Sequence, residues 1–326
     1  MKIPRCSPAI ALALAVIVSP QAPAAAASAI ACDPIRIIDP YPPGGSTGNL
    51  ARLVADKMSK DLGKTVVIEN LGGASGSIGS ARVARSKPDG CTLVIGNDAT
   101  HATNYHLFPD MPFHPLEDAT PITLAAKNII ILGVRKDFPA DDMAGLIAYA
   151  KENPTKLFYG SSGIGSPHHL SGPLLNELAD IDLVHAPYQN GPPALADVLG
   201  GHIPMLFSSL SVALSHIESG DLKALGVTEP ERFPGLPDVA AIAETVPGFA
   251  MTSWVGFFGP KGMPDDIRDE LYASMAKALR SEDVTATLSQ MGLLVTATPP
   301  AEFAVQQRED FERRAKIIAD NQIKRE

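Results

Sequence analysis

The stretch YPPGGSTGNLAR, residues 41–52, joins a short apolar run to a segment of helical periodicity. The run Ile35–Ile38 predicts a strand, and apolar side chains recur at helical spacing from Leu50 onward. The turn would place backbone N–H groups and the hydroxyls of Ser46 and Thr47 at the positive end of a helix dipole, where an anion is favoured. No lysine or arginine lies in the turn itself, residues 41–48, so we expect it to bind a carboxylate rather than a polyphosphate.

Length and charge bound the class of protein. The chain has 326 residues, enough for two domains, and 45% of them are hydrophobic and 19% charged, as in ordinary globular proteins. Its formal net charge is −9, or −11 without Lys2 and Arg5. An acidic chain repels nucleic acid, and the sequence has no basic stripe, so we expect no nucleic-acid partner.

Residues 1–31 have the pattern of a secretory signal peptide. Basic Lys2 and Arg5 precede an apolar run at 9–18, and small residues fill 22–29. The run is too short for a membrane span of about 20 residues, so we expect an exported, periplasmic protein. An N-terminal anchor is the weaker alternative, and a lipid anchor on Cys32 lacks the leucine usual three residues before such a cysteine.

Three successive predicted strands end in small polar loops. The first runs into the turn at 41–52, the second (65–69) into NLGGASGS at 70–77, and the third (91–96) into NDATHATN at 97–104. Ligands bind outside the carboxyl ends of strands in open parallel sheets, so we expect all three loops to face a ligand.

Two cysteines, Cys32 and Cys91, lie beyond the signal segment. They precede the first and third strands, which are neighbours in a doubly wound sheet of order 2-1-3. A disulfide between them is geometrically reasonable in an oxidising compartment, and two unpaired thiols are the alternative.

The second half of the chain repeats this logic. Extended chain at 121–134 leads into a second α/β series, with a glycine- and serine-rich loop, GSSGIGSPH, at 160–168. An aromatic segment at 249–259 predicts a return strand, and a charged helix closes the chain from 300 to about 321. We therefore expect two lobes with a ligand cleft between them: lobe 1 from 32–132, lobe 2 from 133–250, and a return to lobe 1 with C-terminal helices over 251–326.

Catalytic and cofactor patterns are present only in part. Gly44-x-Ser46-x-Gly48 matches a nucleophile elbow, but three prolines separate Ser46 from its strand, and this strand is the first of the sheet. No glycine-rich turn gives the dinucleotide spacing, and there is no P-loop lysine, so no cofactor is expected. His168 and His169 are adjacent and point apart on a helix, so no metal is expected either.

Some residues allow two interpretations. His101 and His168 each follow a polar loop, and either can donate to a ligand or pack and cap a helix. Asp98 has no evident partner for acid–base chemistry, which is typical of a loop or N-cap residue. Tyr41 and Tyr188 either line the cleft or belong to the core.

The motifs together resemble a known family. PPGGSTGNLAR, VVIENLGGASGSIGSARVARSKPDGCTLVIGN, YGSSGIGSPHHLSG, LVHAPYQN and SWVGFFGPKGMP are similar, in this order, to the tripartite tricarboxylate transporter solute-binding family (TctC-like, or Bug, receptors). The resemblance covers essentially everything after the signal segment. It implies an α/β, two-lobed, type II periplasmic-binding-protein-like fold, with a doubly wound, mostly parallel sheet in each lobe. It also implies capture of a small organic carboxylate, mono- or dicarboxylic and including aromatic acids, for delivery to membrane permease subunits.

The resemblance also implies a ligand-binding set, to which Tyr41 is added as a cleft residue. Carried over by position, it comprises Gly45, Ser46, Thr47, Gly48, Asn97, Thr100, His101, Ser161, Ser162, Gly165, Ser166, His168, Tyr188 and Ser208. The family usually has aspartate at the Gly48 position. That departure would remove a negative charge beside the ligand and predicts an acid without an ammonium group.

Two other classes of protein remain as alternatives to a non-enzymatic receptor. One is a hydrolase-like enzyme that uses Ser46 in the same cleft, and it would need a histidine within hydrogen-bond reach of a serine. The other is a sensor subunit that presents its ligand to a membrane kinase. The sequence does not separate sensing from transport, and it does not identify the acid.

Overall fold

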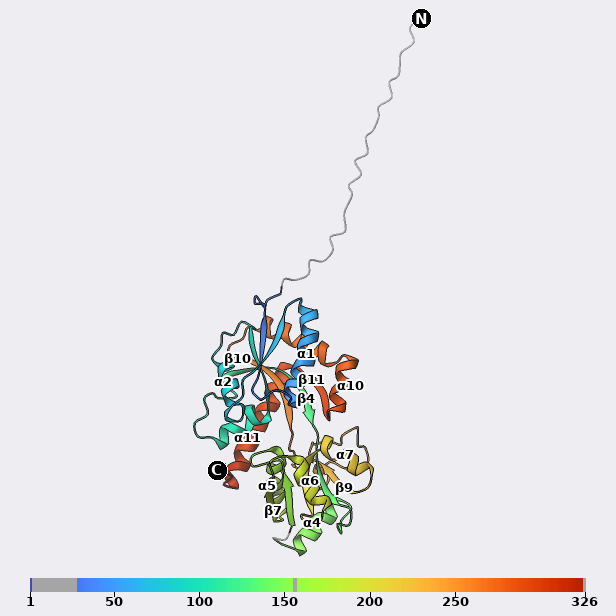
Figure 1. Cartoon of the computed structure of the whole chain (residues 1–326). Helices are drawn as coiled ribbons and strands as arrows, with labels where there is room; N and C mark the ends of the chain where they lie inside the picture. Colours follow the sequence, from blue (N-terminus) through green and yellow to red (C-terminus); the bar gives the residue numbers. More distant parts are fainter. Residues whose placement is uncertain (2–27, 155–156, 325–326) are drawn as a thin grey trace.

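The chain folds into two α/β lobes, one above the other in Figure 1, joined by strands that pass between them. This computed structural model describes residue 1, residues 28–154 and residues 157–324, without the side chain of Ser46. The predicted signal peptide therefore lies almost wholly outside the described residues. Among them, no helix combines the length and apolar character needed to cross a bilayer.

Lobe 1 contains a mixed sheet of order β11-β4-β10-β3-β1-β2. Strands β2, β1 and β3 are parallel, so the predicted 2-1-3 order is confirmed, whereas β10 and β11 run antiparallel to β4. The elements are β1 (Ile35–Asp39), α1 (Ser46–Leu62), β2 (Val66–Asn70), η1 (Ala74–Gly76), α2 (Ser77–Ala84), β3 (Thr92–Asn97), η2 (Ala99–Thr103), α3 (Asn104–Leu107), β4 (Ala119–Asn128), β10 (Trp254–Pro260), α9 (Asp265–Leu279), α10 (Glu282–Gln290), β11 (Leu293–Thr298) and α11 (Pro300–Asp320).

Lobe 2 contains a second mixed sheet, of order β7-β6-β8-β5-β9. Its β5 runs antiparallel to both neighbours, as β10 does in lobe 1. The elements are β5 (Ile130–Arg135), α4 (Met143–Glu152), β6 (Leu157–Ser161), α5 (Pro167–Ala179), β7 (Leu183–Pro187), α6 (Gly191–Leu199), β8 (Met205–Ser209), α7 (Leu210–Glu218), β9 (Leu222–Val227) and α8 (Ile242–Thr245).

The chain crosses between the lobes at two adjacent places. The first crossing is Ile129, between β4 and β5, and the second is the segment 249–253 that leads into β10. Backbone bonds tie them together: Asn128 N donates to Ser253 O at 2.8 Å, and Met251 N donates to Thr228 O at 3.0 Å. Short, hydrogen-bonded crossings of this kind are suited to act as a hinge.

One expectation about the loops is wrong. The polar segment at 97–104 is helical, with the π-helical turn η2 leading into α3. Bonds between neighbouring residues hold this turn: Thr100 N donates to Asn97 Oδ1 at 3.0 Å, and Thr103 Oγ1 donates to Asp98 O at 3.1 Å. These residues therefore build a short helix, where their composition had indicated an open loop.

Asp98 is the N-cap residue of η2, as its sequence position indicated, and it also has an ion-pair partner that the sequence did not reveal. Its carboxylate accepts a bond from Arg314 Nη1 at 3.0 Å, and both side chains are almost fully buried. Arg314 lies on α11 and also donates to Thr252 O, at the second crossing, at 2.7 Å. The helix α11 runs from lobe 1 to the side of lobe 2 (Figure 1), where Ile317 and Ile318 join the lobe 2 core. The C-terminal helix thus ties both lobes to the crossing.

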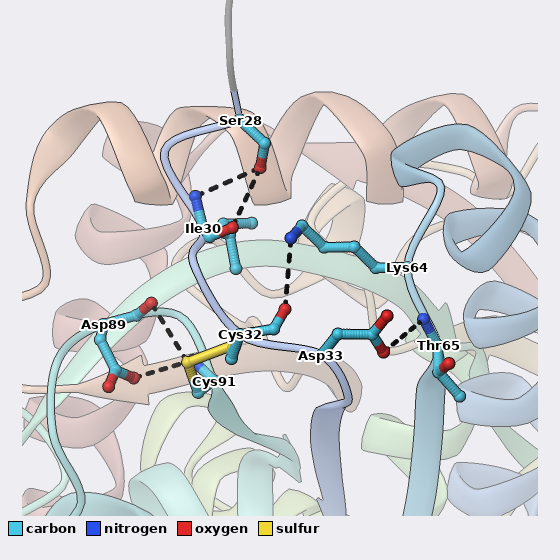
Figure 2. The surroundings of a disulfide bond; sticks show 8 residues. All are labelled: Ser28, Ile30, Cys32, Asp33, Lys64, Thr65, Asp89 and Cys91. Atoms are coloured by element: carbon cyan, nitrogen blue, oxygen red, sulfur yellow. Dashed lines mark hydrogen bonds between the residues drawn. A yellow bond between two sulfur atoms is a disulfide. The ribbon is translucent and has the colours of Figure 1, made fainter.

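Cys32 and Cys91 form a disulfide, with their Cα atoms 5.8 Å apart. Figure 2 shows the bond at the start of the first and third strands, as the 2-1-3 order requires. Hydrogen bonds from Lys64 Nζ to Cys32 O (3.3 Å) and from Cys91 N to Asp89 Oδ1 (3.0 Å) hold the flanking segments. The disulfide links the segment before β1 to the start of β3.

Candidate functional site

A cavity of about 650 Å³ lies between the lobes. Residues from the loop after β1 and from η1, η2 and α3 form its lobe 1 side, and residues from the end of β7 and the loops after β6 and β7 form its lobe 2 side. The lining residues are Tyr41, Ser75, Ala99, Asn104, Leu107, Ser162, Gly163, Ile164, Gly165, Ser166, Pro187, Tyr188 and Gln189. Five of the predicted site residues are in this set: Tyr41, Ser162, Gly165, Ser166 and Tyr188.

On the lobe 1 side, Tyr41 is held by the end of β3. Its hydroxyl donates to Asn97 Oδ1 at 3.0 Å, and Thr100 donates to the same oxygen through its backbone N–H, also at 3.0 Å. Burial raises the pKa of Tyr41 well above its ordinary value. Asn97 and Thr100 therefore orient a cavity residue and do not line the cavity themselves.

Of the first glycine turn as the structure describes it, Gly45, Thr47 and Gly48 are not among the residues that line the cavity. Gly45 is exposed and begins α1 without a side-chain cap, whereas Thr47 is buried with its hydroxyl 3.4 Å from Asp39 Oδ1. A Cβ at Gly48 would clash with the Asp39 carboxylate. Asp39 is itself buried, so Gly48 is a packing position next to an acid from β1. The departure at Gly48 thus gives no reason to exclude an ammonium group on the ligand.

His101 lies in the core of lobe 1. Its ring stacks on Phe258 with centroids 3.9 Å apart, and Thr100 Oγ1 lies 2.8 Å from its Nδ1. Burial lowers the pKa of His101 to about 3, so the ring is neutral at physiological pH. Of the two interpretations, the structure places His101 as a packing residue.

On the lobe 2 side, the three serines of the loop at 160–168 have different partners, and two of them, Ser162 and Ser166, line the cavity. Ser166 caps α5, accepting from His169 N at 3.1 Å and donating to Gly163 O at 2.7 Å. Ser161 is buried, 2.7 Å from His185 Nε2. Ser162 lines the cavity, and its Oγ lies 2.6 Å from His168 Nδ1.

The loop also contacts lobe 1 directly. Gly165 adopts a φ of +78°, and a Cβ there would clash with Leu107 of α3. Leu107 is buried within the lobe 2 core cluster although it belongs to a lobe 1 helix. Glycine is thus required at 165 both for its backbone conformation and for the approach of the opposite lobe.

Two further predicted residues differ in placement. Tyr188 lines the cavity, and its hydroxyl donates to Asp197 Oδ2 at 2.6 Å, so the phenol is anchored to α6. Desolvation and the neighbouring carboxylate raise the pKa of Tyr188 to about 12. Ser208 is fully buried at the end of β8 and does not reach the cavity.

Sequence reasoning missed several lining residues. Ser75 and Asn104 lie in the two loops that were expected to face a ligand, and Asn104 Nδ2 donates to Ser75 O at 3.0 Å. Gln189 lies in the motif LVHAPYQN but was not among the predicted site residues. Leu107 and Ile164 carried no signal, because apolar residues beside polar loops are indistinguishable from core residues in a sequence.

The described part of the cavity lining carries no acidic or basic side chain. Its polar groups are hydroxyls, amides and the backbone of the loops. Burial holds His168 neutral by lowering its pKa to about 4. Within the described residues, no cluster of histidine, cysteine or acidic side chains has the arrangement of a metal site. Neutral donors of this kind bind an anion through oriented dipoles.

The chain is similar to proteins of one family. Residues 50–323 match the family described as "Tripartite tricarboxylate transporter family receptor". A protein encoded in the tcbD-tcbE intergenic region of Pseudomonas sp. strain P51 is 35% identical over 89% of this chain and 87% of its own.

Two solved structures share the fold. A Rhodopseudomonas palustris protein solved with adipate is 32% identical, with a TM-score of 0.70 over 87% of this chain and 96% of that one. MatC of the same organism, solved with malate, is also 32% identical, with a TM-score of 0.68 over 87% and 98%. The expected two-lobed, periplasmic-binding-protein-like α/β fold is confirmed, with mixed sheets where mostly parallel ones were expected. By sequence, motif order and fold, this chain belongs to the tripartite tricarboxylate transporter receptor (TctC) family.

Proposed function

We propose that this protein is an exported receptor that encloses a small organic carboxylate between its lobes and delivers it to a membrane permease of the tripartite tricarboxylate type. The observation that carries the proposal is the 650 Å³ cavity lined from both lobes by neutral hydrogen-bonding groups. Its size lies within the range of small-molecule sites. Relatives of similar sequence and fold were solved with adipate and malate, which supports a dicarboxylate as the ligand class.

The geometry favours a receptor over an enzyme. The Ser162–His168 pair resembles a nucleophile and its base, but burial lowers the pKa of His168 and so weakens it as a base. The other nitrogen of His168 faces a serine hydroxyl, Ser209 Oγ, at 3.2 Å, where a catalytic triad would have a carboxylate. Bound acids are therefore expected to leave the cleft unchanged.

Calorimetry on the purified mature protein tests the proposal. We expect one acid per chain from a panel that includes adipate, malate and aromatic acids, and no binding of the matching neutral diamides. Ligand at 100 times its Kd should stabilise the fold by about 2.7 kcal/mol, which a thermal-shift screen detects. Tyr188→Ala should weaken binding, and Ser215→Ala, an exposed change on α7, should not. Binding of amides equal to that of acids, or turnover of a bound acid, would contradict the proposal.

Delivery to a permease is the second part of the proposal. Co-purification or transport assays in vesicles that contain the cognate membrane subunits test it. We expect uptake of the acid to need both the receptor and the permease. Uptake that is unchanged without the receptor would favour the sensor alternative.

A further inference from the structure

A chain of side-chain hydrogen bonds connects the hinge to the ligand cavity. Asn128, the last residue of β4, donates through Nδ2 to Ser209 Oγ at 2.8 Å. Ser209 Oγ lies 3.2 Å from His168 Nε2, and His168 Nδ1 lies 2.6 Å from Ser162 Oγ. Ser162 lines the cavity. The four side chains thus span from the crossing in lobe 1 to the ligand loop of lobe 2.

The inventory of donors and acceptors allows a direction for this chain that runs from Asn128 to Ser162. The Asn128 amide nitrogen can only donate, so Ser209 accepts from it and has its own proton to donate onward. A neutral histidine has one donor and one acceptor nitrogen, and the buried His168 is neutral. If Ser209 donates to Nε2, the ring hydrogen sits on Nδ1 and donates to Ser162 Oγ. The hydroxyl hydrogen of Ser162 is then left to point elsewhere.

We propose that Asn128, Ser209 and His168 are positioning residues that fix the Ser162 hydroxyl as a hydrogen-bond donor toward the carboxylate of the ligand. The proposal rests on the proposed function for the identity of the ligand. In the reverse direction, Ser162 would donate its hydroxyl hydrogen to His168, and only its lone pairs would face an anion. The hinge amide therefore sets which chemical class the cavity accepts at this point: an acceptor such as a carboxylate oxygen.

Three other hydroxyls of the cavity do not offer the same freedom. Tyr41 donates to Asn97, Tyr188 donates to Asp197, and Ser166 donates to Gly163 O. Each of these hydrogens is directed at an acceptor within the protein. Ser162 differs because its histidine partner supplies the hydrogen, which makes it the hydroxyl that the network prepares for an anion.

The tautomer of His168 is the direct readout. In protein labelled with ¹⁵N-histidine, long-range ¹H–¹⁵N spectra show which ring nitrogen carries the hydrogen, and the His168→Gln variant assigns the signal. We expect the hydrogen on Nδ1 with or without an acid. A hydrogen on Nε2 in the wild-type protein would overturn the proposal. This readout needs no ligand, so it judges the proposal even if no acid is found to bind.

Reversing the first donor tests the direction. In Asn128→Asp the carboxylate can only accept, so Ser209 must donate to it, and the hydrogen of His168 should move to Nε2. Ser162 then loses its donor role, and the affinity for the acid should fall tenfold to a hundredfold, the range expected for a hydrogen bond to a charged group. An unchanged tautomer in Asn128→Asp would overturn the role of Asn128.

Two variants separate this effect from simple repulsion between charges. Asn190→Asp adds the same charge next to Gln189, a lining residue, without touching the chain of bonds, and should leave the tautomer in place. Ser209→Ala breaks the chain without adding charge and should also weaken acid binding by about tenfold. High salt screens repulsion between charges, so the loss of affinity in Asn128→Asp should persist at about 0.5 M NaCl. A loss in Asn190→Asp equal to that in Asn128→Asp, with none in Ser209→Ala, would overturn the proposal.

Discussion

The buried pair of Asp98 and Arg314 gives the sharpest prediction about stability. Arg314 is 1% exposed, and its guanidinium donates to Asp98 Oδ2 at 3.0 Å, to Thr103 Oγ1 at 2.5 Å and to Thr252 O at 2.7 Å. Arg314→Met removes these bonds and leaves a buried carboxylate without its cation. Breaking a buried pair in this way costs about 3–5 kcal/mol, and we expect a loss of that size in the free energy of unfolding.

A neighbouring arginine provides the matched control. Arg313 lies next to Arg314 on the same helix, but its side chain is 31% exposed where it pairs with Asp310. Asp310 is 4% exposed, but it also accepts bonds from Thr252 Oγ1 at 2.9 Å and from Trp254 Nε1 at 2.8 Å. Arg313→Met therefore leaves this carboxylate hydrogen-bonded and should cost less than Arg314→Met. The double variant Asp98→Asn with Arg314→Met removes both charges and should recover part of the loss, because neither charge is then left unpaired.

The pH dependence of the Arg314→Met variant follows from linkage. Burial raises the pKa of Asp98, and Arg314 opposes that rise. Without Arg314 the folded-state pKa lies still further above the unfolded value of 3.8, so the folded protein binds the proton more tightly. The destabilisation should therefore shrink as the pH falls through the folded-state pKa of Asp98 toward the unfolded value of 3.8.

Urea unfolding followed by fluorescence measures these effects directly. Trp254 is the single tryptophan, it is fully buried, and its Nε1 donates to Asp310 Oδ2 at 2.8 Å, beside the pair. Circular dichroism provides a second probe, since two lobes need not unfold in one step. A loss in Arg314→Met no larger than that in Arg313→Met would refute the reasoning.

Three further predictions use the same unfolding assay. Gly165→Ala should lower the free energy of unfolding by about 1–3 kcal/mol more than Gly220→Ala, although both glycines have a similar φ (+78° and +76°). The reason is that a Cβ at 165 meets Leu107, whereas one at 220 meets open space. Equal losses would contradict the contact between the lobes. Replacing Cys32 and Cys91 together by serine should cost about 4 kcal/mol, since the bond spans 59 residues, and reductant should bring the wild-type protein to the same stability. His101 has a folded pKa of about 3, below its unfolded value of 6.5. Its contribution to the free energy of unfolding is therefore complete above pH 6.5 and is lost as the pH falls from there toward about 3. His101→Gln should flatten this decline in stability, and an equally steep decline in the variant would contradict the role given to His101.

Local pattern was sufficient for the parts of the fold that depend on neighbours in sequence. The helix that follows the first turn ends at Gly63, whose φ of +62° is the left-handed conformation that glycine adopts readily at a helix end. The 2-1-3 order followed from strands separated by single helices, and it brought Cys32 to Cys91. These features depend on glycine conformation and hydrophobic periodicity, which the sequence carries locally.

Contacts between residues far apart in the sequence could not be predicted, for a physical reason. Asp98 and Arg314 are 216 residues apart, and nothing in their local sequence distinguishes a buried ion pair from two solvated charges. The same holds for Asn128 and Ser209, whose bond exists only because both strands end at the crossing. For the first glycine turn, composition predicted an anion site, while the packing of Thr47 against Asp39 decides which way its hydroxyl points.

A crystal structure of the protein with a bound dicarboxylate tests the central claim most directly. We predict the acid in the cavity between the lobes, with one carboxylate oxygen within 3.2 Å of Ser162 Oγ, the outer limit of a good hydrogen bond, and groups from lobe 1 on its other side. An acid bound on the outside of either lobe, or one held in the cavity by a lysine or arginine side chain, would contradict the claim that neutral donors from two lobes hold the anion.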